Sequence, residues 1–330
     1  MHYSRGRMPL SRHFSGKLPA AVFVVFSLAS CAVVEPPRIG DADRLRHVAA
    51  LVAEVKDFGK TLGIEPTDAL VQTTEERPAL SMLWFWLQRM GTLALHAPID
   101  VRLAVGFSTV KERLSLERVY HVDGYSVYYR QGNEFAAGRA VATVGFADEA
   151  LGRRVNVIFH EDLHGDANFA LPWEIEEAVV TPLGSLAAIK FFAHKGDGEN
   201  LQRARASVEE ERQLCRELNG LVKQAERVFA SGPLEEARAR ILALMAEYPT
   251  YERHFRRQIK DQNALTVLEA KLSHDLAYFR YFDAVVALSE KAPDLRTLIT
   301  DLKRVPRTAD AAGLEAYLGE LDRNYTAFPR

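Results

Sequence analysis

The chain has 330 residues, of which 48% are hydrophobic and 26% are charged, and its formal net charge is −2. This composition is typical of a globular protein with enough apolar material for one large domain or two modest ones. The near-neutral charge, together with the lack of a basic run interleaved with aromatic residues, argues against nucleic acid as a partner.

The first thirty residues predict an export signal. The basic residues Arg5, Arg7, Arg12 and Lys17 precede the apolar run LPAAVFVVFSLAS. Thirteen residues are too few to span a bilayer core of roughly 30 Å, but they are typical of the apolar region of a secretory signal. We therefore expect residues 1–30 to form a signal peptide.

The end of this apolar run, LASC, resembles a bacterial lipobox, in which the cysteine is lipidated and becomes the first residue of the mature protein. We therefore predict an exported protein that is anchored to the membrane through Cys31, with residues 31–40 as a tether. Ala32 after the cysteine favours the outer membrane of the cell envelope, facing the periplasm. The alternatives are a signal peptide with an incidental cysteine and a short uncleaved anchor.

Two kinds of secondary structure are predicted in the first part of the mature chain. Apolar residues recur at three- and four-residue spacing from Asp41 to about Leu62, which predicts a helix that ends at Gly63. The stretch ERPALSMLWFWLQRMGTLAL is dense in large apolar residues and is expected to be buried. Residues from about 99 to 147 alternate apolar and polar side chains between glycines, which predicts strands.

Helices follow these strands to the end of the chain. The stretch EALGRRVNVIFHEDLHGD predicts one helix, and a second is expected from about Trp173 to Ala193, with a kink at Pro182. The amphipathic pattern then continues with short turns and ends in two short helices. The predicted fold class is α+β, predominantly α-helical, with a core at 41–197 and a C-terminal helical region at 198–330.

The stretch NVIFHEDLHGD, residues 156–166, has the spacing of a hydrolytic metal site. A helix turns about 100° per residue, so His160 and His164 lie on one face and can present ring nitrogens to one ion. Glu161 lies beside them and can reach a water molecule on that ion. The three residues fit the H-E-x-x-H pattern of zinc peptidases. The alternative is an ordinary polar helix face that contains two histidines.

A third ligand is needed, because a catalytic zinc ion usually takes three protein ligands and keeps one position open. The next helix offers Glu174, Glu176 and Glu177. Glu177 and Thr181 share a face with Gly184, which would allow close approach to the motif helix, whereas Glu176 is rotated about 100° away. Glu174 lies on nearly the same face as Glu177. An acidic first turn, which the helix dipole favours, explains one or two of these three glutamates equally well.

These segments resemble a bacterial family of predicted lipoprotein aminopeptidases. NVIFHEDLHG followed by WEIEEAVVTPLG is similar to the family's H-E-L-x-H core and its N-E-x-x-x-T pattern, and TVGFADE, EVKDFGKTLGI and QNALTVLEAKLSHDLAYF resemble further family segments. The resemblance spans most of the mature chain. It implies a small zincin-like core, with a short sheet and the motif helix, and a Zn²⁺ ion held by His160, His164 and Glu177. Thr181 matches the family threonine.

Two residues of the motif segments depart from the family pattern. Asp162 stands where the family has an apolar residue, and Glu176 stands where the family has an asparagine. We expect these departures to bear on peptide specificity more than on the metal.

The resemblance implies a zinc-dependent peptidase, specifically an aminopeptidase, that hydrolyses peptide bonds in the cell envelope. Glu161 would act as the general base and pass a proton to the leaving amine. His274 is expected to stabilise the oxyanion, with Tyr278 as the alternative donor. The other interpretation of His274 is a surface histidine on a scaffold helix.

The residues Thr143, Val144 and Gly145, within ATVGF, are expected to form an edge strand that pairs with an extended peptide substrate. The alternative is a plain sheet strand. Two other functions stay open for the whole chain: a non-catalytic envelope lipoprotein that keeps the fold for assembly or partner binding, and an enzyme that cleaves another amide, such as a cell-wall peptide.

Overall fold

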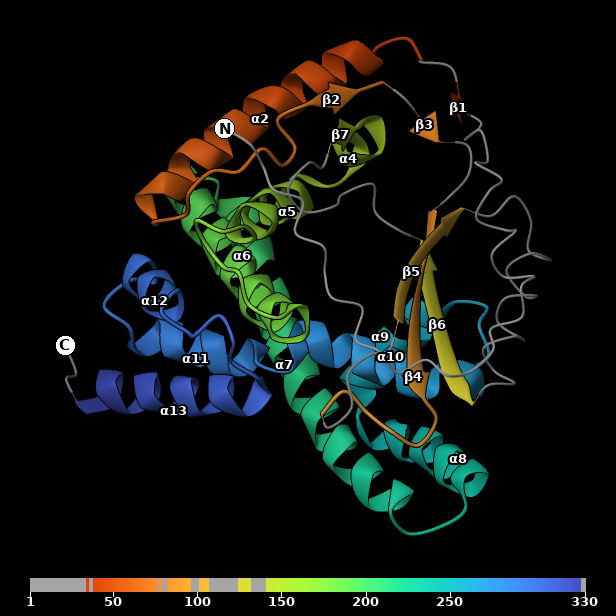
Figure 1. Cartoon of the computed structure of the whole chain (residues 1–330). Helices are drawn as coiled ribbons and strands as arrows, with labels where there is room; N and C mark the ends of the chain where they lie inside the picture. The colour runs from red at the N-terminus through yellow and green to blue at the C-terminus, as the bar shows by residue number, and fades with distance from the viewer. Residues whose placement is uncertain are drawn as a thin grey trace, which may run out of the picture.

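The computed structural model of the chain describes residues 34–35, 38–75, 77–78, 82–95, 101–106, 124–131 and 141–327. The signal peptide and Cys31, the predicted lipidation site, lie outside these residues. The described chain is predominantly helical with three small sheets, which confirms the predicted α+β, mainly α class (Figure 1). None of its helices combines the length and the apolarity that crossing a bilayer requires.

The first part of the chain alternates short strands with three long helices. Its elements are β1 (Val34–Glu35), α2 (Asp41–Thr61), β2 (Thr73–Thr74), β3 (Arg77–Pro78), β4 (Met82–Arg89), β5 (Val101–Gly106), β6 (Tyr125–Gln131), β7 (Ala142–Thr143), α4 (Val144–Asp148), α5 (Leu151–Leu163) and α6 (Trp173–Lys195). The predicted first helix is confirmed as α2, which stops because Gly63 adopts a left-handed conformation with φ +77°. The α6 helix continues through Pro182.

The largest sheet has three antiparallel strands in the order β5-β4-β6, so β4 is central. The other two sheets are single pairs: β1 with β3, antiparallel, and β2 with β7, parallel. The apolar stretch that sequence reasoning expected to be buried supplies β4, whose residues 85–88 are buried.

The remainder of the described chain is helical, as predicted. Its elements are α7 (Gly198–Phe229), α8 (Leu234–Leu244), the 3₁₀ helix η2 (Met245–Glu247), α9 (Pro249–Ile259), α10 (Ala264–Phe279), α11 (Phe282–Lys291), α12 (Leu295–Leu302) and α13 (Ala311–Ala327). The two expected closing helices are α12 and α13.

Two large apolar clusters, beside a small third one, hold the described part of the fold together. The first joins α2, α5 and α6 to α11, α12 and α13, and the second joins β4 and β6 to α7, α8, α9 and α10. In Figure 1 these groups lie on opposite sides of the molecule, and α6, α7 and α10 connect them. Each cluster draws on residues from both sides of the predicted boundary at residue 198, so that boundary does not separate two cores.

In the described residues, the motif helix α5 packs mainly against other helices and not against a sheet. The α5 helix packs between α2 and α6, while the three-stranded sheet covers α10 instead. The physical reason lies in the side chains. Trp86 and Tyr128 project from β4 and β6 into the second cluster, whereas Val155, Ile158 and Phe159 of α5 are buried among helices.

Candidate metal centre

The H-E-x-x-H segment lies at the C-terminal end of α5. The helix ends at Leu163, and His164 is extended (φ −70°, ψ 152°), so the expectation that both histidines lie within one helix is wrong at the second one. Gly165 (φ +109°) turns the chain, and a bond of 3.1 Å from the Phe169 amide to the Leu163 carbonyl closes the turn. The two rings still converge, because His160 Nε2 and His164 Nε2 are 3.2 Å apart.

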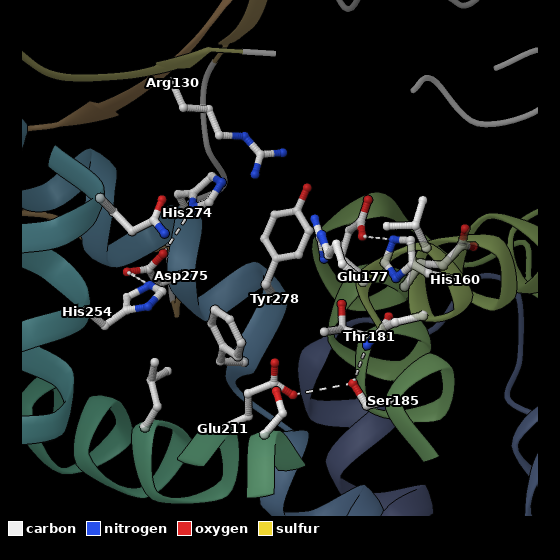
Figure 2. Close-up of a pocket in the computed structure, with 18 of the residues that line it drawn as sticks. Arg130, His160, Glu177, Thr181, Ser185, Glu211, His254, His274, Asp275 and Tyr278 are labelled. Carbon is white, nitrogen blue, oxygen red and sulfur yellow. Dashed lines mark hydrogen bonds and ion pairs between the residues drawn. The ribbon is translucent and has the colours of Figure 1, made fainter. Parts of the chain in front are cut away.

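A carboxylate from α6 completes a triangle of ligand atoms (Figure 2). Glu177 Oε2 lies 3.2 Å from His160 Nε2 and 3.7 Å from His164 Nε2. Two ligands about 2.05 Å from a tetrahedral ion are about 3.3 Å apart, which matches these separations. In the described part of the chain, no other group of histidines, cysteines and carboxylates converges in this way.

Glu176 contacts the outer side of His164 and does not join the triangle. Its Oε1 atom accepts a hydrogen bond of 2.6 Å from His164 Nδ1, and its Oε2 atom accepts one of 2.5 Å from the Leu171 amide. A donor hydrogen on Nδ1 leaves the Nε2 lone pair directed at the triangle, as in carboxylate–histidine–metal arrangements. Glu174 is exposed. The structure therefore brings together His160, His164 and Glu177, the ligands that the resemblance implied.

The electrostatics of the triangle favour the binding of a cation. Burial lowers the pKa of His164, but the hydrogen bond to Glu176 and the nearby Glu177 carboxylate outweigh it and raise that pKa to about 10. Burial raises the pKa of the Glu177 carboxyl, but the two histidines hold it well below its usual range. A metal ion at this point would replace the proton that the histidine otherwise carries.

Two buried oxygens beside the triangle make no hydrogen bond within the described residues. They are Glu161 Oε2 and Thr181 Oγ1, and Glu177 Oε2 is a third such atom within the triangle itself. A buried carboxylate oxygen without a partner is costly, because desolvation removes its water. All three residues line one cavity, so an ion or a substrate group in that cavity can supply the missing partners.

Gly184 sets the spacing between α5 and α6. A Cβ atom at this position would lie 3.3 Å from the His160 amide nitrogen and 3.3 Å from Asn156 Oδ1. Such a contact is tight, so only glycine lets the two helix backbones approach this closely. The predicted role of Gly184 is confirmed, and the close approach carries Glu177 to the histidines.

A buried polar cluster around Asp162 stabilises the motif segment, and sequence reasoning missed it. Asp162, which replaces a family apolar residue, pairs with the buried amine of Lys56 and accepts bonds from the Thr67 amide (3.0 Å) and hydroxyl (2.7 Å). Asn168 donates to the carbonyls of Asp162 (2.6 Å) and Glu65 (2.8 Å). The only sequence signal was a lysine within the apolar stripe of α2.

The cavity that holds the metal-binding triangle has a volume of about 730 Å³. This size lies within the roughly 300–1,000 Å³ range of small-ligand sites. The α5 and α6 helices form one wall. A second, basic wall comes from β6, α9 and α10, to which Arg130, His254, Arg257, Lys271, His274, Asp275 and Tyr278 contribute. Figure 2 labels five of these residues: Arg130, His254, His274, Asp275 and Tyr278.

His274 lines this cavity, but its hydrogen bond does not suit the predicted role as an oxyanion donor. Its Nδ1 atom lies 3.0 Å from Asp275 Oδ1, and a carboxylate there can only accept, so Nδ1 carries the proton. Burial lowers the pKa of His274 to about 3, against the effect of Asp275. The neutral ring therefore presents a bare Nε2, which accepts hydrogen bonds. Tyr278, the alternative donor, lines the same cavity.

The expected edge strand over Thr143, Val144 and Gly145 is wrong beyond its first residue. β7 ends at Thr143, whose hydroxyl accepts a hydrogen bond of 3.2 Å from the Phe146 amide and caps α4. Val144 and Gly145 are the first residues of that helix. The three residues are not among those that line the cavity. Their predicted role in substrate binding gains no support from this arrangement.

No protein-family model, no curated protein and no solved structure matches the chain. The resemblance to lipoprotein aminopeptidases therefore stays a prediction that rests on the motif segments.

Proposed function

We propose that the protein is a zinc-dependent peptidase whose ligands are His160, His164 and Glu177. The observation that carries the proposal is the triangle of their ligand atoms, with separations of 3.2, 3.2 and 3.7 Å, in the wall of a large cavity. Two imidazoles, one carboxylate and an open side are the ligand set of catalytic zinc. Magnesium and calcium prefer oxygen ligands alone, so the donor set favours zinc.

When bound, zinc supplies Lewis acidity, which acidifies water and polarises a peptide carbonyl. Glu161 accepts the proton of the attacking water and transfers it to the leaving nitrogen, a role that its buried and unpartnered Oε2 suits among the described residues. Glu176 holds the His164 ring in one tautomer. The Tyr278 hydroxyl, on the opposite wall, donates to the oxyanion.

The proposal extends to where the protein acts. An export signal followed by LASC supports lipidation at Cys31 and an outer-membrane location facing the periplasm, so the substrates would be peptides of the cell envelope. The α5 helix with His164 directly after it, together with α6, would form the centre of a zincin-like core. The alternative function, a non-catalytic envelope lipoprotein, leaves no task for Glu161 in the cavity wall.

Metal analysis separates the two functions. After chelation and reconstitution, the wild-type protein should hold close to one zinc ion per chain, and His164→Ala should hold almost none. A mixture of short peptides should be cleaved only by the zinc-loaded wild type. A wild-type chain that binds no zinc would refute the proposal, and a zinc-loaded chain that cleaves no peptide would favour the non-catalytic function.

A further inference from the structure

Arg130, near the end of β6, extends into the cavity without an acidic partner among the described residues. Its guanidinium carbon lies 5.2 Å from the ring centroid of Trp86 and 5.7 Å from that of Tyr278, and its Nε atom is buried without a hydrogen bond. Figure 2 shows its terminal nitrogens directed into the space between the walls. The aromatic rings restrain the guanidinium, while its N–H groups stay available for a planar anion such as a carboxylate.

His274 places an acceptor beside this donor. Its residue surface is 5% exposed, its Nε2 makes no hydrogen bond within the described chain, and its Nδ1 is occupied by Asp275. The ring packs edge-on against Trp86, with centroids 4.5 Å apart, and lies 5.0 Å from the ring of Tyr278. Arg130 and His274 therefore share the same two aromatic neighbours and face the same cavity.

The charge of the cavity is divided between its walls. On the basic wall the Asp275 carboxylate forms ion pairs with Lys271 and His254 and accepts a hydrogen bond from the Tyr251 hydroxyl. It therefore does not neutralise Arg130. The opposite side carries one arginine, Arg153, against five carboxylates, which are Glu161, Glu176, Glu177, Glu210 and Glu211. An anionic group of a ligand would therefore be attracted to the Arg130 wall and repelled by the other.

We infer that Arg130 and His274 bind the C-terminal residue of a short peptide, with its carboxylate on the guanidinium and its amide N–H on His274 Nε2. A C-terminal residue carries an acceptor anion and a donor N–H on either side of one carbon, which matches a donor and an acceptor side by side. This inference names the substrate class of the proposed peptidase and rests on that function. It predicts that peptides with a free C-terminus are preferred.

Calorimetric titration of the metal-free, full-length protein tests the inference without turnover. The probes are tri-alanine, its C-terminal amide, and an ester analogue in which lactate replaces the last alanine and removes the N–H. We expect tri-alanine to bind about 10- to 100-fold more tightly than the amide, since hydrogen bonds to charged groups are worth about 1.5–3 kcal/mol. The ester analogue should bind about 3- to 10-fold more weakly than tri-alanine.

Two variants attribute this preference to Arg130. Arg130→Gln should bind tri-alanine and its amide equally, whereas Arg153→Gln, which removes an exposed arginine on the α5 wall of the same cavity, should keep the preference. Arg130→Lys retains a positive charge but not the planar guanidinium, which can donate two parallel hydrogen bonds to a carboxylate, so it should keep only part of the preference. Unchanged unfolding temperatures would show that the variants fold.

Several results would overturn the inference. They are equal binding of tri-alanine and its amide by the wild type, a preference that survives Arg130→Gln, and no binding of tri-alanine at millimolar concentration. Equally tight binding of Ala-Ala-Asp amide would mean that any carboxylate is accepted, which also contradicts it. A preference for free C-termini in a protein that hydrolyses nothing when loaded with zinc would refute the proposed function but not this site.

Discussion

The neighbouring glutamates of α6 allow the sharpest test of the metal centre. Glu177 supplies a triangle atom 3.2 Å from His160 Nε2, whereas Glu176 reaches only the outer nitrogen of His164, at 2.6 Å. Glu177→Gln should therefore lose stoichiometric zinc. Glu176→Gln should keep the site but weaken its affinity about 10- to 100-fold, or roughly 1.4–2.7 kcal/mol, as expected for an outer partner of a metal-bound histidine.

Competition with a chromogenic chelator at fixed pH measures these affinities. Glu174→Gln is the matched control, because Glu174 lies in the same first turn of α6 but is exposed, and its zinc affinity should equal that of the wild type. If Glu176→Gln lost zinc outright while Glu177→Gln retained it, the assignment of the two carboxylates would be reversed. If all three variants kept wild-type affinity, the third ligand would have to come from elsewhere in the chain.

Three further predictions follow from the contacts around the site. The zinc dissociation constant, measured with the same chelator, should fall about tenfold for each pH unit gained between about 7 and 9. The reason is that zinc displaces the proton that His164 holds below its pKa of about 10. A pH-independent constant would show that no proton is displaced. Gly184→Ala should push α6 away from α5. The free energy of unfolding, measured by denaturant titration, should fall by about 1–3 kcal/mol, and the zinc affinity, measured with the chelator, should fall as well. Gly152→Ala, where a Cβ meets open space in α5, should change neither, and equal behaviour of the two variants would argue against a spacing role. Asp162→Leu should lower the free energy of unfolding by about 3–5 kcal/mol, because it leaves Lys56 buried without its partner. Adding Lys56→Met should recover most of the loss. A small loss in Asp162→Leu alone would mean that the pair does not stabilise the motif.

The helices and the His160–His164 pair could be predicted from sequence because both depend on local spacing, whereas the choice of Glu177 as the third ligand came from the family resemblance. The period of apolar residues located α2 and α5, and Glu177 lies 13 residues after His164 on the next helix. The end of α5 at Leu163 was missed, although Gly165 directly after the motif is a stop signal.

The errors in the strand region have local and non-local causes. The Thr143 hydroxyl caps a helix, which competes with the β pattern of the residues around it. The position of the sheet is non-local, since Ser126 bonds to the Thr266 carbonyl across 140 residues of sequence. No periodicity could indicate that the sheet would cover α10 rather than α5.

The composition of the second wall of the cavity could be predicted only in part for the same reason. The resemblance pointed to His274 and Tyr278, but Arg130 carries no motif and is far from both in sequence, so only the fold shows that it shares their cavity. The Lys56–Asp162 pair joins residues 106 positions apart. In both cases the chemistry depends on tertiary contacts rather than on a motif.

Hydrolysis of a short peptide by Glu161→Gln beside the wild type tests the central claim most directly. Both proteins are reconstituted with zinc, and their zinc content is measured in the same samples. The account predicts close to one zinc ion per chain in each, cleavage by the wild type, and a loss of about 100-fold or more in the variant, because Glu161 moves the proton and does not hold the metal. Equal cleavage by the two zinc-loaded proteins would contradict it.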